Sequence, residues 1–269
     1  MLKRILLLNI LLLVVIANAF CQNPPQEFFK GLDMMEVDKP AAKAYFLEAA
    51  NKDPAFFGTY HFLGVIATNM HQPDSAIFYY KKAIELNKGN AKLAAMTYLR
   101  LINEYVYSKD FKNAFDTGWN AYKLYPEDRM IATALKDACL WSVYIKYDNL
   151  DPNYLSADIK DEYVVTSIDQ EYLILRKLRV NDNTLSVSAQ SLANKKGASY
   201  DILKCFVQGT KDQKEIMFKI NWDMAKYFGG KPADTQKIDA SKPIYERIGA
   251  IMLKDDKADL KTEIEKLMN

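Results

Sequence analysis

The first half of the chain alternates helix-length amphipathic stretches with short turn signals. In residues 60–87 the apolar positions follow the spacing of two amphipathic helices, with Pro73 between them. Small residues stand beside bulky ones inside these helices, at Gly64, Ala76 and Ala83. Small side chains at these positions predict two antiparallel helices that cross closely, with Gly64 facing the two alanines.

This arrangement of small and aromatic residues occurs three times, with the first copy 34 residues before the second and the third copy 38 residues after it. The positions are Ala42, Phe46, Ala49 and Pro54; Ala76, Tyr80, Ala83 and Lys88; and Ala114, Gly118, Ala121 and Pro126. Such a period is typical of a helical-repeat solenoid, in which each helix pair buries its apolar face against the next. The amphipathic stretch 127–147 is expected to cover the last pair.

These residues resemble the tetratricopeptide repeat, and the second copy matches its pattern best. Tyr60, Leu63 and Gly64 stand at the aromatic, leucine and glycine positions of the first helix. The third copy has Tyr98 at that glycine position, and the first copy has Gly31 one residue late. The resemblance covers residues 25–148 and implies an α-helical solenoid domain. The residues expected to pack inside it are Leu63, Gly64, Ala76, Tyr80, Ala83, Ala42, Phe46, Ala49, Ala114 and Ala121.

The resemblance also implies a concave surface that binds extended peptides or helices. The Lys, Asn and Arg clamp of chaperone-binding members is missing from this sequence. The candidate groove residues are His61, Val65, Thr68 and Asn69 in the second copy, and Lys92 and Ala95 in the third. The alternative interpretation is that these residues only cover the helical stack.

The second half has a different period. Asp151-Pro152-Asn153 indicates a turn or linker. A strand (162–168), a helix (169–178) and three strands (184–192, 199–208 and 214–222) are expected to follow. Asp169 is the expected N-cap of the helix, and residues 209–213 form the last hairpin loop. This order predicts a small antiparallel α+β domain at 158–230, with the helix on one face of the sheet. The expected fold class is therefore α+β, with an N-terminal helical solenoid.

This half resembles, through a softer motif, a domain of unknown function in exported bacterial proteins that carry short helical repeats. The matching residues are Val164-Val165, Ile168-Asp169-Gln170-Glu171-Tyr172, Ile174-Leu175 and the stretch 215–228, EIMFKINWDMAKYF. The resemblance implies no known chemistry. Residues 231–269 are expected to form a linker and C-terminal helices, with Ser241 as N-cap of the first.

Residues 1–21 predict a secretory signal peptide. Lys3 and Arg4 precede an apolar run, and Ala17-Asn18-Ala19 is a small-residue cleavage pattern. Cleavage is expected after Ala19 or Cys21, leaving a periplasmic or secreted chain without an integral membrane segment. A lipid anchor on Cys21 is the alternative, although Phe20 stands where that motif has a small residue.

Net charge, cysteines and histidines exclude several further classes of function. A formal net charge of +2 with mixed signs offers no basic stripe for nucleic acid. Cys139 and Cys205 are expected to be free and buried. The two histidines, His61 and His71, lie in no recurrent catalytic or zinc-binding motif. No catalytic, cofactor-binding or metal-binding residue is therefore assigned, and no cofactor is expected.

The sequence thus predicts an exported, non-enzymatic tetratricopeptide-repeat protein that mediates protein–protein interaction or envelope assembly, with a protein or peptide partner. Two alternatives stay open. One is a hydrolase-like enzyme with its site in the α+β half, where Asp169 and Glu171 are better explained as first-turn residues of a helix. The other is a lipid-anchored envelope scaffold.

Overall fold

The computed structural model describes residues 24–87, 91–156, 158–180, 183–195, 197–221, 237–255 and 257–268. The chain divides into two compact units. The first comprises Met1–Ser108 and Thr117–Ile131, and the second comprises Lys109–Asp116 and Ala132–Asn269. The division runs through helices α7 (Phe111–Leu124) and α8 (Arg129–Tyr147). Both helices lie before Asp151-Pro152-Asn153, the turn at which the sequence analysis ends the repeats.

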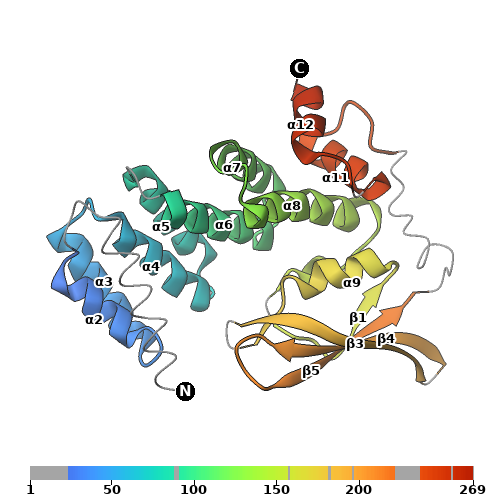
Figure 1. Cartoon of the computed structure of the whole chain (residues 1–269), viewed down its shortest axis with the longest axis horizontal. Helices are drawn as coiled ribbons and strands as arrows, with labels where there is room; N and C mark the ends of the chain where they lie inside the picture. The colour runs from blue at the N-terminus through green and yellow to red at the C-terminus, as the bar shows by residue number, and fades with distance from the viewer. Residues whose placement is uncertain are drawn as a thin grey trace. The chain divides into compact units, whose positions relative to one another are not determined.

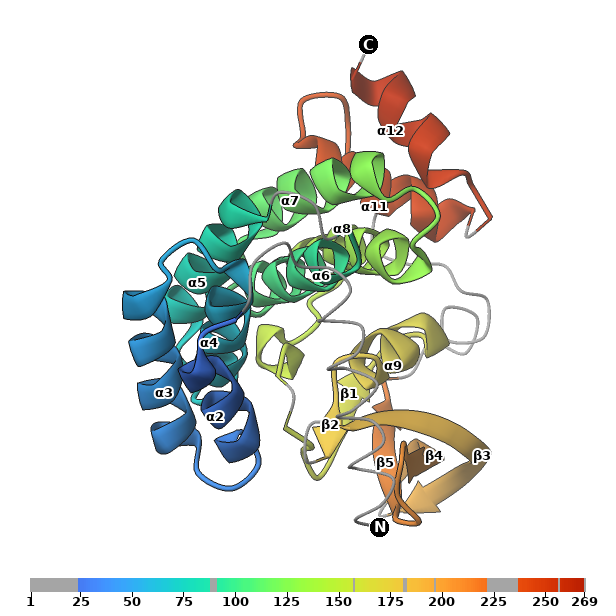
Figure 2. The same cartoon turned by 60° about the vertical axis from the view of Figure 1, so that its left-hand side comes forward.

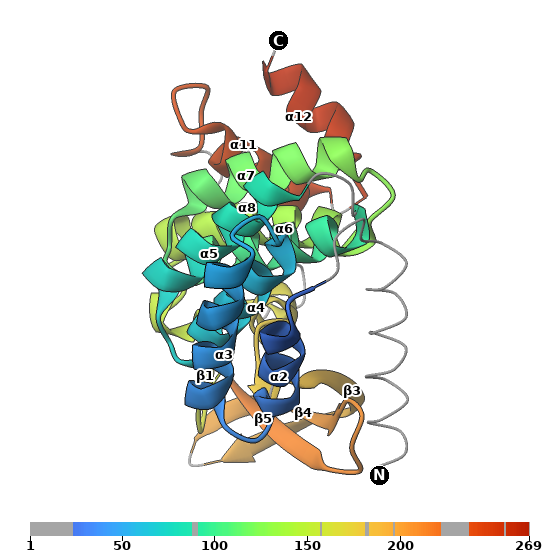
Figure 3. The same cartoon turned by 90° about the vertical axis from the view of Figure 1, so that its left-hand side faces the viewer.

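The first unit is built from successive helices that each pack against the next (Figure 1). They are α2 (Gln26–Met34), α3 (Lys39–Lys52), α4 (Phe57–Asn69), α5 (Pro73–Leu86) and α6 (Ala91–Tyr107). Figure 2 and Figure 3 show α2 and α3 side by side as the first pair. Helices α4 and α5 form the second pair, and α6 packs on α5. The expected N-terminal helical repeats are confirmed.

A glycine under an aromatic ring closes each of the first two pairs. A Cβ atom added to Gly64 would lie 2.4 Å from Cε1 of Tyr80, and one added to Gly31 would lie 2.7 Å from Cε1 of Phe46. Gly64 therefore faces the Tyr80 ring, whereas the sequence analysis placed it opposite Ala76 and Ala83. The ring needs this space because all of Tyr80 is buried.

The alanines of the repeat pattern fill the remaining interior positions. Ala42, Phe46, Ala49, Ala76, Ala83, Ala114 and Ala121 are fully or almost fully buried, as are Leu63 and Tyr80. Small side chains at these positions let neighbouring helices approach closely without leaving voids. The sequence pattern thus corresponds to the buried face of the repeats.

The second unit contains a five-stranded mixed sheet with strand order β1-β5-β4-β3-β2. The strands of this sheet are β1 (Tyr163–Val165), β2 (Arg179–Val180), β3 (Asn183–Lys195), β4 (Ala198–Val207) and β5 (Gln213–Ile220). The 3-10 helix η1 (Pro152–Tyr154) precedes β1, and helix α9 (Ile168–Leu175) connects β1 to β2. Strands β3, β4 and β5 are antiparallel neighbours, as expected. Strand β1 pairs with β5 in parallel, and this pairing was not expected.

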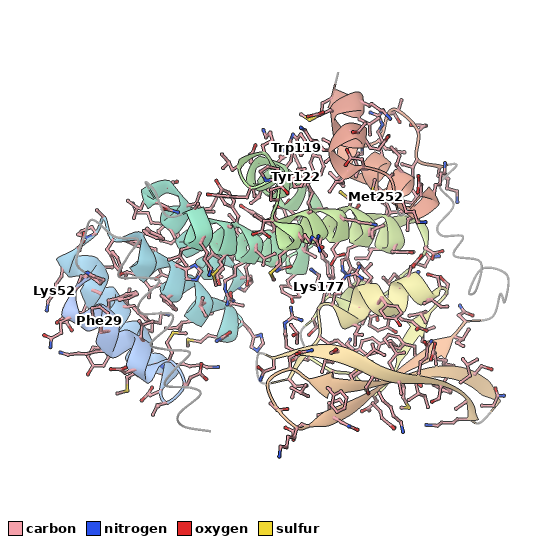
Figure 4. The ribbon with its side chains drawn as sticks, in the orientation of Figure 1. Phe29, Lys52, Trp119, Tyr122, Lys177 and Met252 are labelled. Carbon is pink, nitrogen blue, oxygen red and sulfur yellow. The ribbon has the colours of Figure 1, made fainter. Side chains whose placement is uncertain are left out.

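Helix α9 lies between the sheet and α8 within the second unit (Figure 1). Ile216, Phe218 and Ile220 of β5 are buried, because alternate residues of the strand point to one face of the sheet. The Arg176 Nη2 atom lies 2.7 Å from Oδ1 of Asp137 on α8. Lys177 is buried beside the same carboxylate (Figure 4), and this burial lowers the pKa of its ammonium.

Three details of this unit differ from the sequence analysis. Ser167, and not Asp169, is the N-cap of α9, because its side chain accepts a hydrogen bond from the backbone N–H of Gln170. Strand β3 contains a register shift between Val187 and Ala189, so simple alternation does not continue along it. The short strand β2 was missed. Trp222, the last residue of the expected strand, and the residues that follow it in the matching stretch 215–228 lie outside the described residues.

Two further helices, α11 (Ile244–Lys254) and α12 (Leu260–Met268), complete the described part of the second unit. The N-cap of α11 is Pro243, and not Ser241, whose hydroxyl donates to Asp239 Oδ1 at 2.5 Å. A Cβ atom on Gly249 would lie 2.6 Å from the Cys139 carbonyl oxygen, so α11 packs closely on α8. Met252 of α11 is buried near the same helix (Figure 4).

The remaining sequence expectations concern the cysteines and the membrane. Cys139 and Cys205 are both free and buried, as expected. Within the described ranges, no helix combines the length and apolar character needed to cross a bilayer. Residues 1–23, which carry the expected signal peptide, lie outside those ranges.

Candidate binding surface of the helical repeats

Half of the expected groove residues lie in the interior of the first unit. His61 and Ala95 are 2% and 7% exposed, and Val65 is buried as well. A partner cannot reach buried side chains without opening the fold. These three residues therefore do not form a groove, because His61 and Val65 on α4 and Ala95 on α6 all lie inside the helical stack.

His61 has a structural hydrogen bond. Its Nδ1 atom lies 2.8 Å from Thr97 Oγ1, and the Thr97 hydroxyl donates to the Leu93 carbonyl at 2.7 Å. Because that hydroxyl hydrogen is already used, the His61 Nδ1–H must donate to Thr97. Burial, assisted by the nearby Arg100 charge, lowers the pKa of His61 to about 3. The neutral ring ties α4 to α6.

Thr68 is partly exposed, but its hydroxyl is also used inside the unit. It donates to Glu104 Oε1 at 2.5 Å and lies 3.1 Å from the Tyr80 hydroxyl. Burial raises the pKa of Glu104. Of the six candidates, Asn69 is partly exposed and Lys92 is exposed. These two remain on the surface of the unit, where a partner could contact them.

The first unit has a hollow of about 240 Å³ that the sequence analysis did not identify. It lies between the end of α5, the start of α6 and the end of α7, and its lining is Ile84, Asn87, Ala91, Ala94, Tyr98, Leu124 and Tyr125. The ring centroids of Tyr98 and Tyr125 lie 6.2 Å apart, and the two ring planes are inclined by 56° to each other. Leu124 is 60% exposed, which is high for a leucine beside two tyrosines.

The walls of this hollow carry no formally charged side chain. Burial raises the pKa of both Tyr98 and Tyr125, which keeps their hydroxyl groups neutral. The lining therefore suits an apolar or aromatic group better than an ion. We call this surface, defined by the seven lining residues, the α5–α7 hollow.

A packed layer supports the α5–α7 hollow from behind. Ala95, Ala121 and Ile131 form a buried cluster, and Tyr98, Tyr122 and Tyr125 pack against it. On α7 the Trp119 ring stacks on Tyr122 with centroids 6.0 Å apart (Figure 4). Ring positions held by such packing give the hollow a defined shape before any partner binds.

The sequence does contain a signal for this hollow. The repeat positions that hold Gly64 and Tyr80 in the second copy hold Tyr98 and Gly118 in the third. Large and small residues are thus exchanged, and Tyr98 stands where close helix packing would require glycine. In the structure its ring lies beside Tyr125 and lines the α5–α7 hollow. Departure from a repeat pattern is therefore the feature that marks this surface.

The alternative of an enzyme depends on how the candidate carboxylates and histidines lie. No group of three or more His, Cys, Asp or Glu among the described residues is placed to hold a metal ion. Asp169 is exposed at the start of α9, whereas Glu171 is fully buried. These two carboxylates therefore do not share an accessible site. His71, at the end of α4, is exposed, and its φ of 54° belongs to a turn.

No protein-family model and no curated protein matches this sequence. Among solved structures, the chain is similar to the crystal structure of the APC/C hetero-tetramer Cut9-Hcn1, with 21% sequence identity and a TM-score of 0.40. The match covers 57% of this chain and 29% of that chain. The matched part therefore spans less than a third of the length of that protein.

Proposed function

We propose that this chain is an exported, non-enzymatic protein that binds a protein partner through its helical repeats. The observation that carries the proposal is the α5–α7 hollow, an uncharged recess on a helical stack with Leu124 exposed beside it. Helical-repeat stacks commonly bind peptides or helices, and an uncharged recess of this size accepts a single anchoring side chain.

The size of the hollow limits what it contributes to affinity. Burying one leucine- or phenylalanine-sized side chain contributes about 1.5–3 kcal/mol. Micromolar binding requires about 8 kcal/mol, so the partner must also contact the surrounding surface. Helix α6, which lines the hollow, also carries the exposed residues Lys92 and Met96. We therefore expect an extended or helical segment with one apolar anchor in the hollow.

The test is comparative capture from a bacterial envelope extract with the mature chain and with Leu124→Glu. A glutamate at this position places a charge in the uncharged recess, so a partner that uses the hollow is expected to be lost. Val37→Glu is the matched control, because Val37 is 79% exposed and does not line the hollow. Proteins recovered by the wild type and by Val37→Glu, but not by Leu124→Glu, support the proposal.

The captured protein must then be purified and titrated directly. A dissociation constant that rises at least about tenfold in Leu124→Glu, which corresponds to 1.4 kcal/mol, assigns binding to the hollow. Equal recovery by all three chains would show that binding uses another surface. Recovery of nothing above background would remove the protein-binding proposal.

The export proposal rests on the basic, apolar and small-residue segments of residues 1–21. Intact mass of the chain from its native envelope tests it. Loss of the first 19 or 21 residues indicates a cleaved signal peptide, and additional acyl mass on a chain that begins at Cys21 indicates a lipid anchor. A full-length mass would refute both.

A further inference from the structure

The second unit has a polar hollow of about 300 Å³ that plays no part in the proposed protein binding. It lies where β1 and β5, the two parallel strands, end at Val165 and Ile220. The next residues, Thr166 and Asn221, both line it. The full lining is Asp148, Asn149, Leu150, Asp151, Tyr154, Val164, Thr166, Gln170 and Asn221. Carboxyl ends of parallel strands are common ligand-binding positions.

One wall of the hollow is a fixed hydrogen-bond network. Asp148 is 8% exposed, and its Oδ2 atom accepts from Thr166 Oγ1 at 2.8 Å and from Gln170 Nε2 at 2.7 Å. Gln170 Oε1 in turn accepts from the Thr166 backbone N–H at 2.9 Å. Both ends of the Gln170 amide are therefore used. Asp148 is a positioning residue, which holds Thr166 and Gln170 in one arrangement.

An aromatic side chain is held equally firmly. The centroids of the Tyr154 and Tyr163 rings lie 5.0 Å apart in an edge-to-face contact. Lys160 Nζ lies 5.3 Å from the centroid of the Tyr154 ring. The Tyr154 oxygen accepts from the Val164 backbone N–H at 2.9 Å. Val164 is 42% exposed and lines the hollow beside this ring. A small apolar surface is therefore present next to the polar groups.

The groups left for a ligand are mainly neutral. Among the described residues, no hydrogen-bond partner is found for the side-chain amides of Asn149 and Asn221, both of which are exposed. Asp151 uses Oδ1 to accept from the Asn153 backbone N–H at 2.8 Å, which leaves Oδ2. Two amides supply donors as well as acceptors, so the set complements a ligand that has both.

The lining also excludes other classes of ligand. The lining contains two aspartates and no lysine, arginine or histidine, so an anion would meet carboxylates, and the nearby Lys160 ammonium already lies over the Tyr154 ring. No group of three metal-ligating side chains is found in the described part of the chain. A cationic group would use the Asp151 and amide oxygens but would leave the N–H donors of both amides without acceptors. A neutral ligand with several hydroxyl groups matches all of the available atoms.

We propose that this hollow binds a small neutral polyhydroxylated ligand of the size of one sugar ring. The volume is at the lower end of the range for ligand pockets, which suits a single ring. The ring's apolar face would pack on Val164 and Tyr154, and its hydroxyl groups would bond to Asn149, Asn221 and Asp151. Glycosidic cleavage normally needs two available carboxyl groups, and Asp148 is committed to its network, so the site binds without cleaving.

Saturation-transfer NMR on the mature chain tests this, with D-glucose, D-galactose, D-mannose and N-acetyl-D-glucosamine as separate probes. We expect saturable binding of at least one sugar, with a dissociation constant on the order of 1 mM for so small a ligand. L-Arginine and inorganic phosphate are the cationic and anionic comparison probes. Binding of arginine or phosphate without any sugar would overturn the proposal, and so would binding of none of the probes.

Two substitutions locate the site. Asn149→Gly removes the amide at a φ of 54°, which glycine adopts without strain, and Asn221→Ala removes the second amide. Each is expected to weaken sugar binding about five- to tenfold, the effect of one lost hydrogen bond. Asn153→Ala is the matched control, because Asn153 is exposed nearby and does not line the hollow. Sugar binding that is unchanged in both variants would place the ligand elsewhere and refute the assignment.

Discussion

Replacing Gly64 by alanine is expected to destabilise the second helical pair, although the same change stabilises most helices. The added Cβ would lie 2.4, 2.6 and 2.9 Å from Cε1, Cδ1 and Cζ of Tyr80. The ring has no room to move aside, because Tyr80 is fully buried and its hydroxyl lies 3.1 Å from Thr68 Oγ1. The methyl group must therefore push α4 and α5 apart.

The size of the effect follows from two opposing contributions. Overpacking a filled interior costs about 1–3 kcal/mol, and the upper end applies because three atoms of a rigid ring are involved. Alanine is favoured over glycine inside a helix by about 1 kcal/mol. The net loss in the free energy of unfolding for Gly64→Ala is therefore about 2 kcal/mol.

Native-state hydrogen exchange is the suitable assay, because it reports on α4 and α5 within the whole two-unit chain. A loss of about 2 kcal/mol corresponds to exchange about 30-fold faster in peptides from these helices. A second variant, Tyr80→Leu, removes the ring that the added methyl group would meet. In the double variant, Gly64→Ala is expected to be neutral or stabilising relative to Tyr80→Leu alone, so the two changes have a measurable coupling energy. Unchanged or slower exchange in the single variant Gly64→Ala would refute the packing described for this pair.

His61→Phe is expected to flatten the acid sensitivity of the first unit. The folded-state pKa of about 3 lies below the ordinary 6.5, so wild-type stability falls by up to about 1.4 kcal/mol per pH unit between these values. An equal slope in urea unfolding of both proteins would contradict this. Glu104→Gln is expected to raise stability at neutral pH, because burial raises the pKa of Glu104 and its ionisation opposes folding. The advantage should shrink as the pH falls through the raised pKa of Glu104 and vanish below the ordinary pKa of a glutamate, where the carboxyl group is protonated in both the folded and the unfolded chain. Glu246→Ala removes the acceptor of Lys146 Nζ at 2.6 Å and of the Tyr147 hydroxyl at 2.5 Å. Amides of α11 should then exchange at least about tenfold faster, since two hydrogen bonds to a buried carboxylate are lost. No change in α11 would show that it is held by packing alone.

The helical half was predictable because its information is local and repeated. The spacing of alanines, aromatic residues and turn signals indicates where helices begin and end and which face is buried. Ala76, Tyr80 and Ala83 are buried as this pattern requires. The hairpin of β4 and β5 was predictable for a similar reason, since alternation and a short glycine-containing loop act over neighbouring residues.

The binding candidates could not be read in the same way. His61 was expected in the groove, yet it is buried and its ring bonds to Thr97, 36 residues away. The position of α6 determines which side of α4 is buried. The spacing of residues within α4 does not specify that position. The same holds for Asp148, whose partners Thr166 and Gln170 follow a turn and a strand.

The sequence by itself therefore determined the helical repeats, the antiparallel hairpins and the small residues at helix crossings, because each depends on contacts between near neighbours. Only the tertiary structure decided that β1 joins β5 in parallel, that Tyr98 and Tyr125 line one hollow, and that a second hollow opens where β1 and β5 end. These features join residues far apart in the chain. Their partners are chosen by the packing of whole elements, and a local pattern does not specify that choice.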